Sequence, residues 1–121
     1  MKFFRISKAL FSSNIFKMEL NRINVLTRKF ETKYNTAPFS QIKLEDYRPA
    51  FEENIKKAKG EINLIVSSTE EPNFQNTIEA LDFSGEELTN VQNIFFNLNS
   101  AETSDEMQKI ALEISPMMTD F

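Results

Sequence analysis

Residues 49–67 read PAFEENIKKAKGEINLIVS, and this stretch decides the fold class. Its apolar side chains recur at spacings of four, three, four and three residues, so a helical backbone would place them on one stripe. The stripe consists of Phe51, Ile55, Ala58, Ile62, Ile65 and Val66. Pro49 suits the first position of a helix, because its missing N–H group would have no partner there. We therefore expect an amphipathic helix over about residues 49–67, after a short turn that contains Leu44 and Tyr47.

A second helix is expected from Phe74 to about Asn99. Pro72 ends the preceding loop, and Asn73 has a side chain suited to cap the new helix. The apolar residues of this helix fall on two faces, which predicts a bend or break near Gly85 and its neighbour Ser84. The first face holds Phe74, Ile78, Leu81 and Gly85, and the second holds Leu88, Val91, Ile94, Phe95 and Leu98.

A third helix is expected over about residues 104–121. Thr103 and Glu106 have the spacing of a capping box, which marks the start of the helix. Pro116 is expected to kink it. Its apolar stripe consists of Met107, Ile110, Ala111, Ile114, Met118 and Phe121. The sequence thus predicts an all-α fold of three helices.

Four large apolar residues do not fit these stripes. Leu64, Phe83, Phe96 and Leu112 lie on the outer faces of their helices, where three helices offer little cover. The third stripe also continues to Phe121 without a helix stop signal. Two interpretations remain open. The chain is either a three-helix bundle with a frayed end or the incomplete, N-terminal part of a larger helical fold.

The composition excludes several classes of catalytic site. The 121 residues contain no histidine, no cysteine and only two glycines. Serine–histidine and cysteine–histidine nucleophiles, histidine or cysteine zinc sites, disulfides and glycine-rich phosphate loops are therefore excluded. The adjacent acid pairs Glu52-Glu53, Glu70-Glu71 and Glu86-Glu87 are expected on the solvated surface. We expect no catalytic, cofactor-binding or metal-binding residue in this chain, and the absence of cysteine allows a reducing compartment.

Charge divides the chain into a basic start and an acidic body. Residues 1–33 carry eight basic and two acidic side chains, and residues 34–121 carry six basic and sixteen acidic ones. The acidic body argues against a nucleic acid as partner. We expect residues 1–23 to be a basic extension and residues 24–121 to be the helical segment.

Three interpretations of the basic extension stay open. Residues 1–18 carry four cations, no acid and three serines, which is typical of a targeting presequence. Alternatively, Met18 is the true start and residues 1–17 are untranslated. A third interpretation is a membrane-surface helix with Phe3, Ile6 and Leu10 on one side, although one short helix binds membranes only marginally. No uncharged run is long enough to span a bilayer, so a membrane partner is not expected.

Four segments resemble, in the same order, the thimet-oligopeptidase-type family of zinc metallopeptidases. APFSQIKLEDYRPAFEE (37–53) is similar to the N-terminal signature of that family, and EPNFQNTIEAL (71–81) to its P-x-F-x-N-T-I-x-A-L segment. FFNLNSAETSDEMQ (95–108) and EISP (113–116) resemble the following helix end, cap and kinked helix. The nearest branch is that of the bacterial peptidyl-dipeptidases, also called dipeptidyl carboxypeptidases, with oligopeptidase A nearby. The resemblance runs from about Asn24 to the last residue, and colinear motifs of this length are specific.

The resemblance implies an N-terminal fragment of a zinc metallopeptidase that removes dipeptides from the C-termini of short peptides. These helices would form part of the wall of a substrate channel, with the rest of the peptidase chain as their partner. The HExxH helix, the zinc and the other catalytic residues would lie outside this chain, so we expect these 121 residues to be inactive alone. The expected location is the cytoplasm unless the basic extension is a targeting segment. The alternative is a stand-alone helical module that binds peptides or proteins through Phe83, Phe96 and Leu112.

Overall fold

The computed structural model describes residues 23–121, and all regular structure in that range is helical. The long helices are α2 (Leu44–Val66), α4 (Glu86–Ala101) and α5 (Asp105–Thr119). The shorter ones are η1 (Val25–Thr27), η2 (Lys33–Asn35), η3 (Phe39–Gln41), the π-helix η4 (Phe74–Glu79) and α3 (Ala80–Phe83). The predicted all-α class is confirmed. The interpretations that concern residues 1–18 and a start at Met18 lie outside the described residues.

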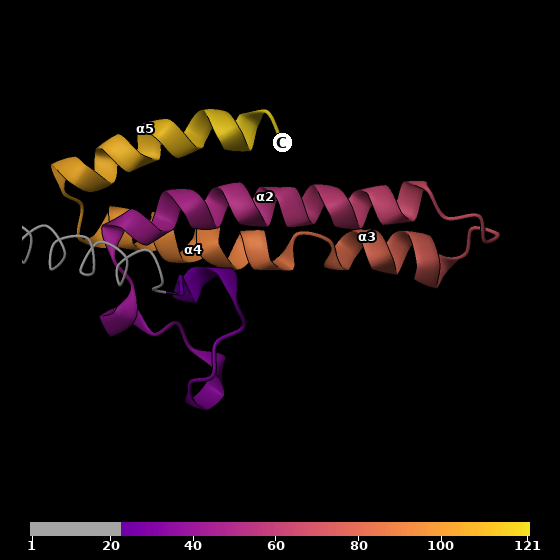
Figure 1. Cartoon of the computed structure of the whole chain (residues 1–121), viewed down its shortest axis with the longest axis horizontal. Coiled ribbons are helices and arrows are strands. Elements are labelled where there is room, and N and C mark those ends of the chain that lie inside the picture. Colours follow the sequence, from indigo (N-terminus) through magenta and orange to yellow (C-terminus); the bar gives the residue numbers. More distant parts are fainter. Residues whose placement is uncertain (1–22) are drawn as a thin grey trace, which may run out of the picture.

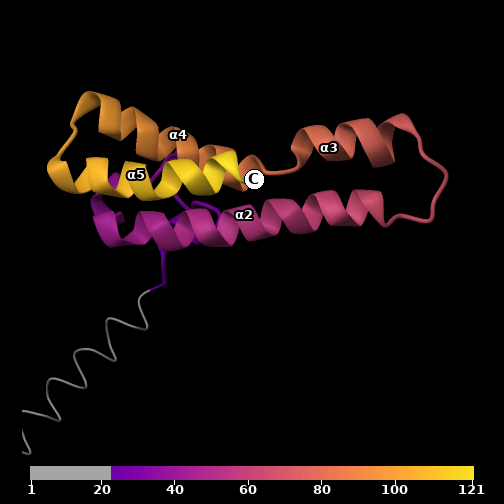
Figure 2. The same ribbon diagram turned by 90° about the horizontal axis from the view of Figure 1, so that it is seen from above.

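Helix α2 is the longest helix of the described residues, and the other long helices lie along it. After the loop at residues 67–73 the chain turns back, and η4, α3 and α4 run along α2 in the opposite direction (Figure 1). Helix α5 lies over α2 and α4 on one side, and the irregular segment before α2 lies on the other side (Figures 1 and 2). The far part of α2 projects beyond this cluster together with α3 as a two-helix hairpin.

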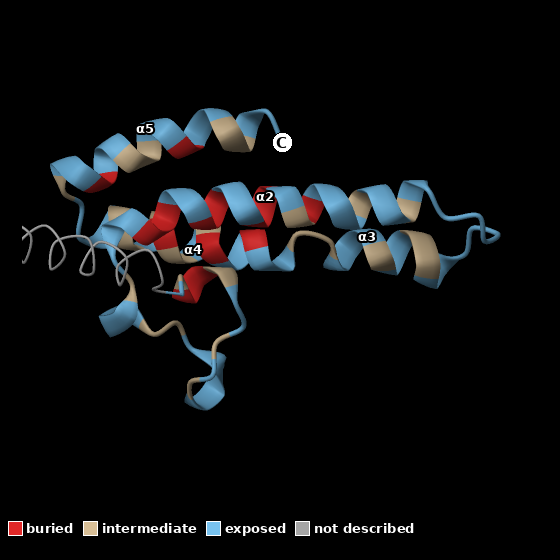
Figure 3. Ribbon diagram, viewed as in Figure 1, coloured by how far each residue is buried: buried red, intermediate tan, exposed pale blue. Residues whose placement is uncertain are grey.

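The hydrophobic core occupies one half of this elongated shape. Figure 3 shows the buried residues gathered in the first half of α2, in α4, in η1 and on the inner face of α5. At its centre the Phe95 ring packs edge-on against Tyr47 and Phe51, with centroid separations of 4.9 and 5.9 Å. Such aromatic pairs add about 0.5–1.5 kcal/mol to what burial alone contributes. The buried apolar residues are Val25, Leu26, Tyr47, Ala50, Phe51, Ile55, Ala58, Leu88, Val91, Phe95, Met107 and Ile114.

Polar side chains fasten the segment before α2 to this core. Asn24 Oδ1 accepts a hydrogen bond from the Leu26 N–H (3.0 Å), while Asn24 Nδ2 donates to the Asp46 carbonyl (2.7 Å). Asn54 Nδ2 donates to the Leu26 carbonyl (3.3 Å), and Lys57 Nζ donates to the carbonyl of Thr27 (3.0 Å). Three of these bonds satisfy backbone groups of η1, and the bond to Asp46 ties Asn24 to the start of α2.

Helix α2 begins earlier than predicted, at Leu44 rather than near Pro49. The Lys43 N–H donates to Asp46 Oδ2 (2.8 Å), so Asp46 closes the helix start, and Leu44 is helical rather than part of a separate turn. Pro49 therefore lies inside the helix, where it removes one backbone hydrogen bond. The early start is favoured because it buries Tyr47, which is 2% exposed.

The predicted second helix is interrupted, as its two apolar faces indicated. Ser84 has an extended backbone, and Gly85 adopts φ 76°, a left-handed conformation that glycine enters without steric cost. The predicted break is confirmed, and α4 then runs to Ala101, beyond the predicted end at Asn99. The predicted cap at Asn73 is also confirmed, because its Oδ1 accepts from the N–H of Asn76 (2.9 Å).

The cap of α5 was misplaced by one residue. Ser104 Oγ accepts from the Met107 N–H (3.2 Å), whereas the hydroxyl of Thr103 donates to Asn99 Oδ1 (2.9 Å). Ser104 has the extended backbone that an N-cap requires, so the predicted box of Thr103 and Glu106 is wrong. The helix continues through Pro116 and ends at Thr119, two residues before the predicted end. The kink at Pro116 stays a prediction.

Candidate docking surface

The adjacent acid pairs lie on the surface, as predicted, and several of their members form ion pairs. Arg48 Nε lies 3.2 Å from Glu52 Oε1, and Lys57 Nζ lies 3.6 Å from Glu53 Oε1 and 3.0 Å from Glu87 Oε2. The hydrogen bond to Glu87, together with the charges of Glu87 and Glu53, raises the pKa of Lys57 above its ordinary value. The Lys57–Glu87 pair joins α2 to α4, whereas the other two pairs lie within α2, and exposed pairs of this kind contribute little to stability.

The described residues were compared with the needs of a metal site. Residues 23–121 contain no group of three or more histidine, cysteine, aspartate or glutamate side chains placed to hold a metal. The sequence itself supplies neither histidine nor cysteine, the donors that zinc prefers. No helix within residues 23–121 is long and apolar enough to cross a bilayer.

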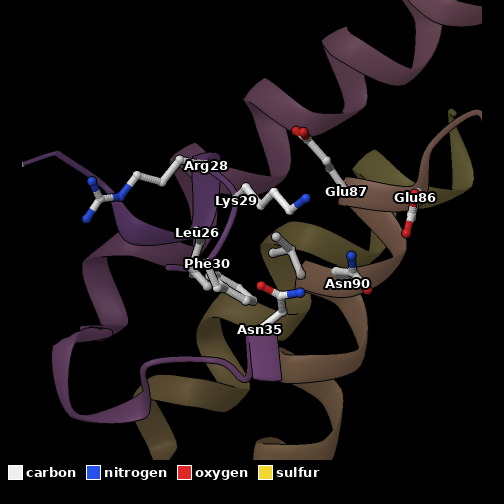
Figure 4. A pocket seen from close by; sticks show the side chains of 9 residues that line it. Leu26, Arg28, Lys29, Phe30, Asn35, Glu86, Glu87 and Asn90 are labelled. Carbon is white, nitrogen blue, oxygen red and sulfur yellow. The ribbon is translucent and has the colours of Figure 1, made fainter. Parts of the chain in front are cut away.

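A pocket of about 360 Å³ opens between the segment before α2 and the start of α4. Leu26, Phe30 and Val91 give it an apolar floor, and Arg28, Lys29, Asn35, Glu86, Glu87 and Asn90 surround it. Figure 4 shows Arg28 extending away from the two carboxylates and from Asn90. The charged groups therefore do not converge on one point, and we do not assign a ligand to this pocket.

The most distinctive surface is the projecting hairpin, which we call the apolar arm (residues 59–85). It comprises the end of α2, the loop at 67–73, η4 and α3. No residue of the arm is buried, although α2 contributes buried residues as far as Ala58. Its exposed large apolar residues, each between 52% and 78% exposed, are Leu64, Val66, Phe74, Ile78, Leu81 and Phe83. Uncovered large apolar side chains gathered in one region are typical of an interaction site.

Local bonds hold the arm together without a core of its own. Asn73 and Asn76 cap η4 reciprocally, because the Asn73 N–H also donates to Asn76 Oδ1 (2.8 Å). At the base of the arm the Gly85 N–H donates to Glu61 Oε2 (2.7 Å). A Cβ atom built on Gly85 would lie 3.6 Å from Ala58 Cβ, so the two helices approach closely there. The arm is therefore a formed hairpin with one apolar face uncovered.

That face contains an open groove of about 730 Å³. Phe74, Ile78, Leu81 and Phe83 form its apolar surface, and Glu79 and Asp82 also line it. The first three were predicted to share a face, and the four-residue and three-residue spacing did locate that stripe. In the described residues these three side chains are more than half exposed.

The four residues that were predicted to lie on outer faces differ in their exposure. Leu64, Phe83 and Leu112 are largely exposed, as predicted. Phe96 is half-buried and packs edge-on against Phe95, with the ring centroids 5.1 Å apart, so its placement on an outer face is wrong. The candidate set of Phe83, Phe96 and Leu112 therefore does not form one binding surface. The residues that join Phe83 are Phe74, Ile78 and Leu81.

Comparisons with known proteins give a relationship over most of the chain. The chain is 39% identical over 87 residues to the dipeptidyl carboxypeptidase of Escherichia coli strain K12, and this match covers 72% of the chain and 13% of that protein. It is 40% identical over 77 residues to the dipeptidyl carboxypeptidase of Salmonella typhimurium strain LT2, covering 64% of the chain and 11% of that protein. No family model matches the chain. The predicted relationship to peptidyl-dipeptidases is confirmed, and the chain spans only a small share of these relatives.

Proposed function

We propose that residues 24–121 are an N-terminal helical part of a peptidyl-dipeptidase-like peptidase. The activity of the whole protein would be hydrolysis of peptide bonds, with release of dipeptides from the C-termini of short peptides. The observation that carries this proposal is the 39% identity to a dipeptidyl carboxypeptidase over 87 residues. An identity of this size over most of the chain, with motifs in the same order, is far more specific than a single motif.

In this proposal the helices contribute to the wall of the substrate channel and are covered elsewhere by the rest of the peptidase. The uncovered apolar arm supports the proposal that the rest of the peptidase covers these helices. Full burial of one large apolar side chain stabilises by about 1.5–3 kcal/mol, and the arm leaves six such side chains in contact with water. Contact with the remainder of the peptidase chain would recover much of that free energy.

We assign the chemistry itself to the rest of the peptidase. The zinc that the resemblance implies would be bound outside these 121 residues, because this chain has neither histidine nor cysteine. Its role would be to restrict access to the channel and to support the fold. A cytoplasmic location belongs to the same proposal, since a chain without cysteine needs no oxidising compartment.

The decisive test is the DNA that follows the codon of Phe121. We expect it to continue in frame and to encode an HExxH helix. A natural stop codon at that point, with no HExxH-coding sequence downstream, would falsify the proposal for this gene.

A peptidase assay tests the same proposal on protein. The 121-residue chain should show no hydrolysis of short peptides, with or without added zinc, and the extended reading frame should be active. Activity of the short chain alone would contradict the division of roles.

A stand-alone interaction module is the second candidate, and the exposed arm also favours it. This candidate requires that the 121-residue chain unfold cooperatively. Partial helicity with hydrophobic-dye binding and without a cooperative melt would exclude it and would favour a part that needs the rest of the peptidase.

A further inference from the structure

Beyond its first residue, Lys59, the apolar arm is also acidic throughout. Residues 60–85 carry five carboxylates and neither lysine nor arginine. The five are Glu61, Glu70, Glu71, Glu79 and Asp82. The acidic run continues into α4, because no lysine or arginine occurs between Lys59 and Lys109, and the ion pairs of the described residues lie around Lys43, Arg48 and Lys57. The exposed apolar side chains of the arm therefore lie within a longer acidic run.

Most of these carboxylates are available to a partner. Glu61 already accepts the Gly85 N–H, whereas the other four form no ion pair within residues 23–121. Glu79 and Asp82 line the same groove as Phe74, Ile78 and Leu81. An occupant of the groove would therefore meet apolar side chains and negative charge together.

The charge pattern excludes several occupants. The arm of a second copy carries the same five carboxylates, so contact between two arms would bring like charges together. Phosphates of a nucleic acid or of an anionic membrane would be repelled for the same reason. A complementary partner must present apolar side chains flanked by lysine or arginine.

We infer that the apolar arm docks a cationic amphipathic helix, supplied by a segment of the peptidase outside these 121 residues. The inference rests on the proposed function, and it adds the chemistry of the partner. The lining of this groove comes from η4 and α3 alone, so its apolar row at residues 74, 78 and 81 offers a helix face against which a second amphipathic helix can pack. The chain spans only 11–13% of its relatives, so the proposed parent has ample sequence to supply that helix.

The test uses two synthetic helical peptides with the same leucine stripe. One carries lysine at every polar position and the other carries glutamate. Each is titrated onto the 121-residue chain and binding is followed by fluorescence anisotropy. We expect the lysine peptide to bind at least about tenfold more tightly at low salt, and the difference to shrink as salt is added. Equal binding of both peptides would overturn the inference, because it would reduce the arm to a non-specific apolar surface.

Charge-reversal variants locate the effect. The double variant Glu79→Lys with Asp82→Lys should lose the preference for the lysine peptide or invert it. The matched control, Glu102→Lys with Asp120→Lys, changes the net charge equally at exposed positions outside the arm and should keep the preference. Circular dichroism checks that both variants retain the helicity of the parent chain. Loss of the preference in the control as well, or tight self-association of the chain in place of peptide binding, would also overturn the inference.

The outcome is independent of the test of the proposed function. A reading frame that ends at Phe121 would remove the peptidase as the source of the helix and leave the peptide result unchanged. A failed peptide preference would remove the cationic partner and leave the peptidase assignment unchanged.

Discussion

The two halves of α2 share the same periodic pattern of apolar residues but differ in burial. From Asp46 to Ala58 the helix buries a residue at nearly every turn, because α4, α5 and η1 surround it. From Lys59 to Val66 the apolar positions continue, yet no residue is buried. The periodicity of a helix thus specifies which face will pack. The number of neighbours that the chain can bring to that face decides whether it does pack.

The difference between these halves has a structural cause at Gly85. The break at this residue follows α3, and it separates η4 and α3 from α4. Helix α5 then folds back over the first half of α2 (Figure 2). The second half of α2 is left with α3 and η4 as its neighbours, and their own apolar stripe faces water. The packed half and the arm should therefore differ in how they respond to substitution.

The largest effect is expected in the packed half, at Phe95. Phe95 is fully buried and touches three other aromatic rings, so Phe95→Ala should lower the free energy of unfolding by about 3–5 kcal/mol. The matched variant in the arm is Phe83→Ala, where the side chain is 62% exposed, and its cost should stay below about 1 kcal/mol. Urea unfolding of both variants measures the comparison. Similar losses would show that the arm is packed in solution.

The two glycines provide the next test, because they lie in opposite conformations. Gly85 has φ 76°, so Gly85→Ala should destabilise the chain by about 1–2 kcal/mol. Gly60 is inside α2, and a Cβ atom there would meet nothing within 4 Å, so Gly60→Ala should stabilise by about 0.5–1 kcal/mol. Thermal unfolding of the two variants should shift in opposite directions. A stabilising Gly85→Ala would mean that the break is absent in solution.

The fold class and the helices could be predicted from sequence because their signals are local. Spacing of apolar residues located the stripes of Phe51, Ile55 and Ala58, and a change of face located the break at Gly85. The start of α2 could not be predicted in this way. Pro49 is a strong local signal for a helix start, and burial of Tyr47 in contact with Phe95 overrides it. That contact joins residues far apart in the chain, so no local pattern reveals it.

The candidate surface was only half predictable for the same reason. Its members Phe74, Ile78 and Leu81 could be placed on one face, but whether that face is covered depends on where α4 and α5 go after Gly85. Phe96 shows the opposite case. It lies off its own helical stripe, and the ring of Phe95 beside it still provides a partner.

Substitutions at two helix caps, one in the packed half and one in the arm, should have smaller effects on stability. Ser104 caps α5, whose Met107 and Ile114 belong to the core, so Ser104→Ala should lower the global free energy of unfolding by about 1 kcal/mol. Asn73 caps η4 in the arm, and Asn73→Ala should instead speed amide hydrogen exchange around Asn76 with little global change. Hydrogen exchange combined with urea unfolding separates the two results. A global loss from Asn73→Ala would mean that the arm unfolds together with the packed half.

The smallest effect at neutral pH concerns Tyr47, and it emerges only under alkaline conditions. Burial, and next the negative charge of Asp46, raises the pKa of the Tyr47 hydroxyl above its ordinary value of 10.0. The folded chain then holds this proton more tightly than the unfolded chain does. The resulting stability is fully present below pH 10 and is lost as pH rises through the folded pKa. Lys57 adds a loss in the same direction, because its raised pKa belongs to an ion pair that disappears on deprotonation.

Two variants separate these contributions. Tyr47→Phe should weaken the alkaline loss of stability, whereas the contribution of Lys57 should persist in it. In the Tyr34→Phe variant, Tyr47 is the remaining tyrosine of the chain, so tyrosinate absorbance follows its ionisation alone. We expect the midpoint of that absorbance change to lie above pH 10 and the change to accompany the loss of helicity. Ionisation of Tyr47 at or below pH 10 in the folded chain would show that the packed half is as open to water as the arm.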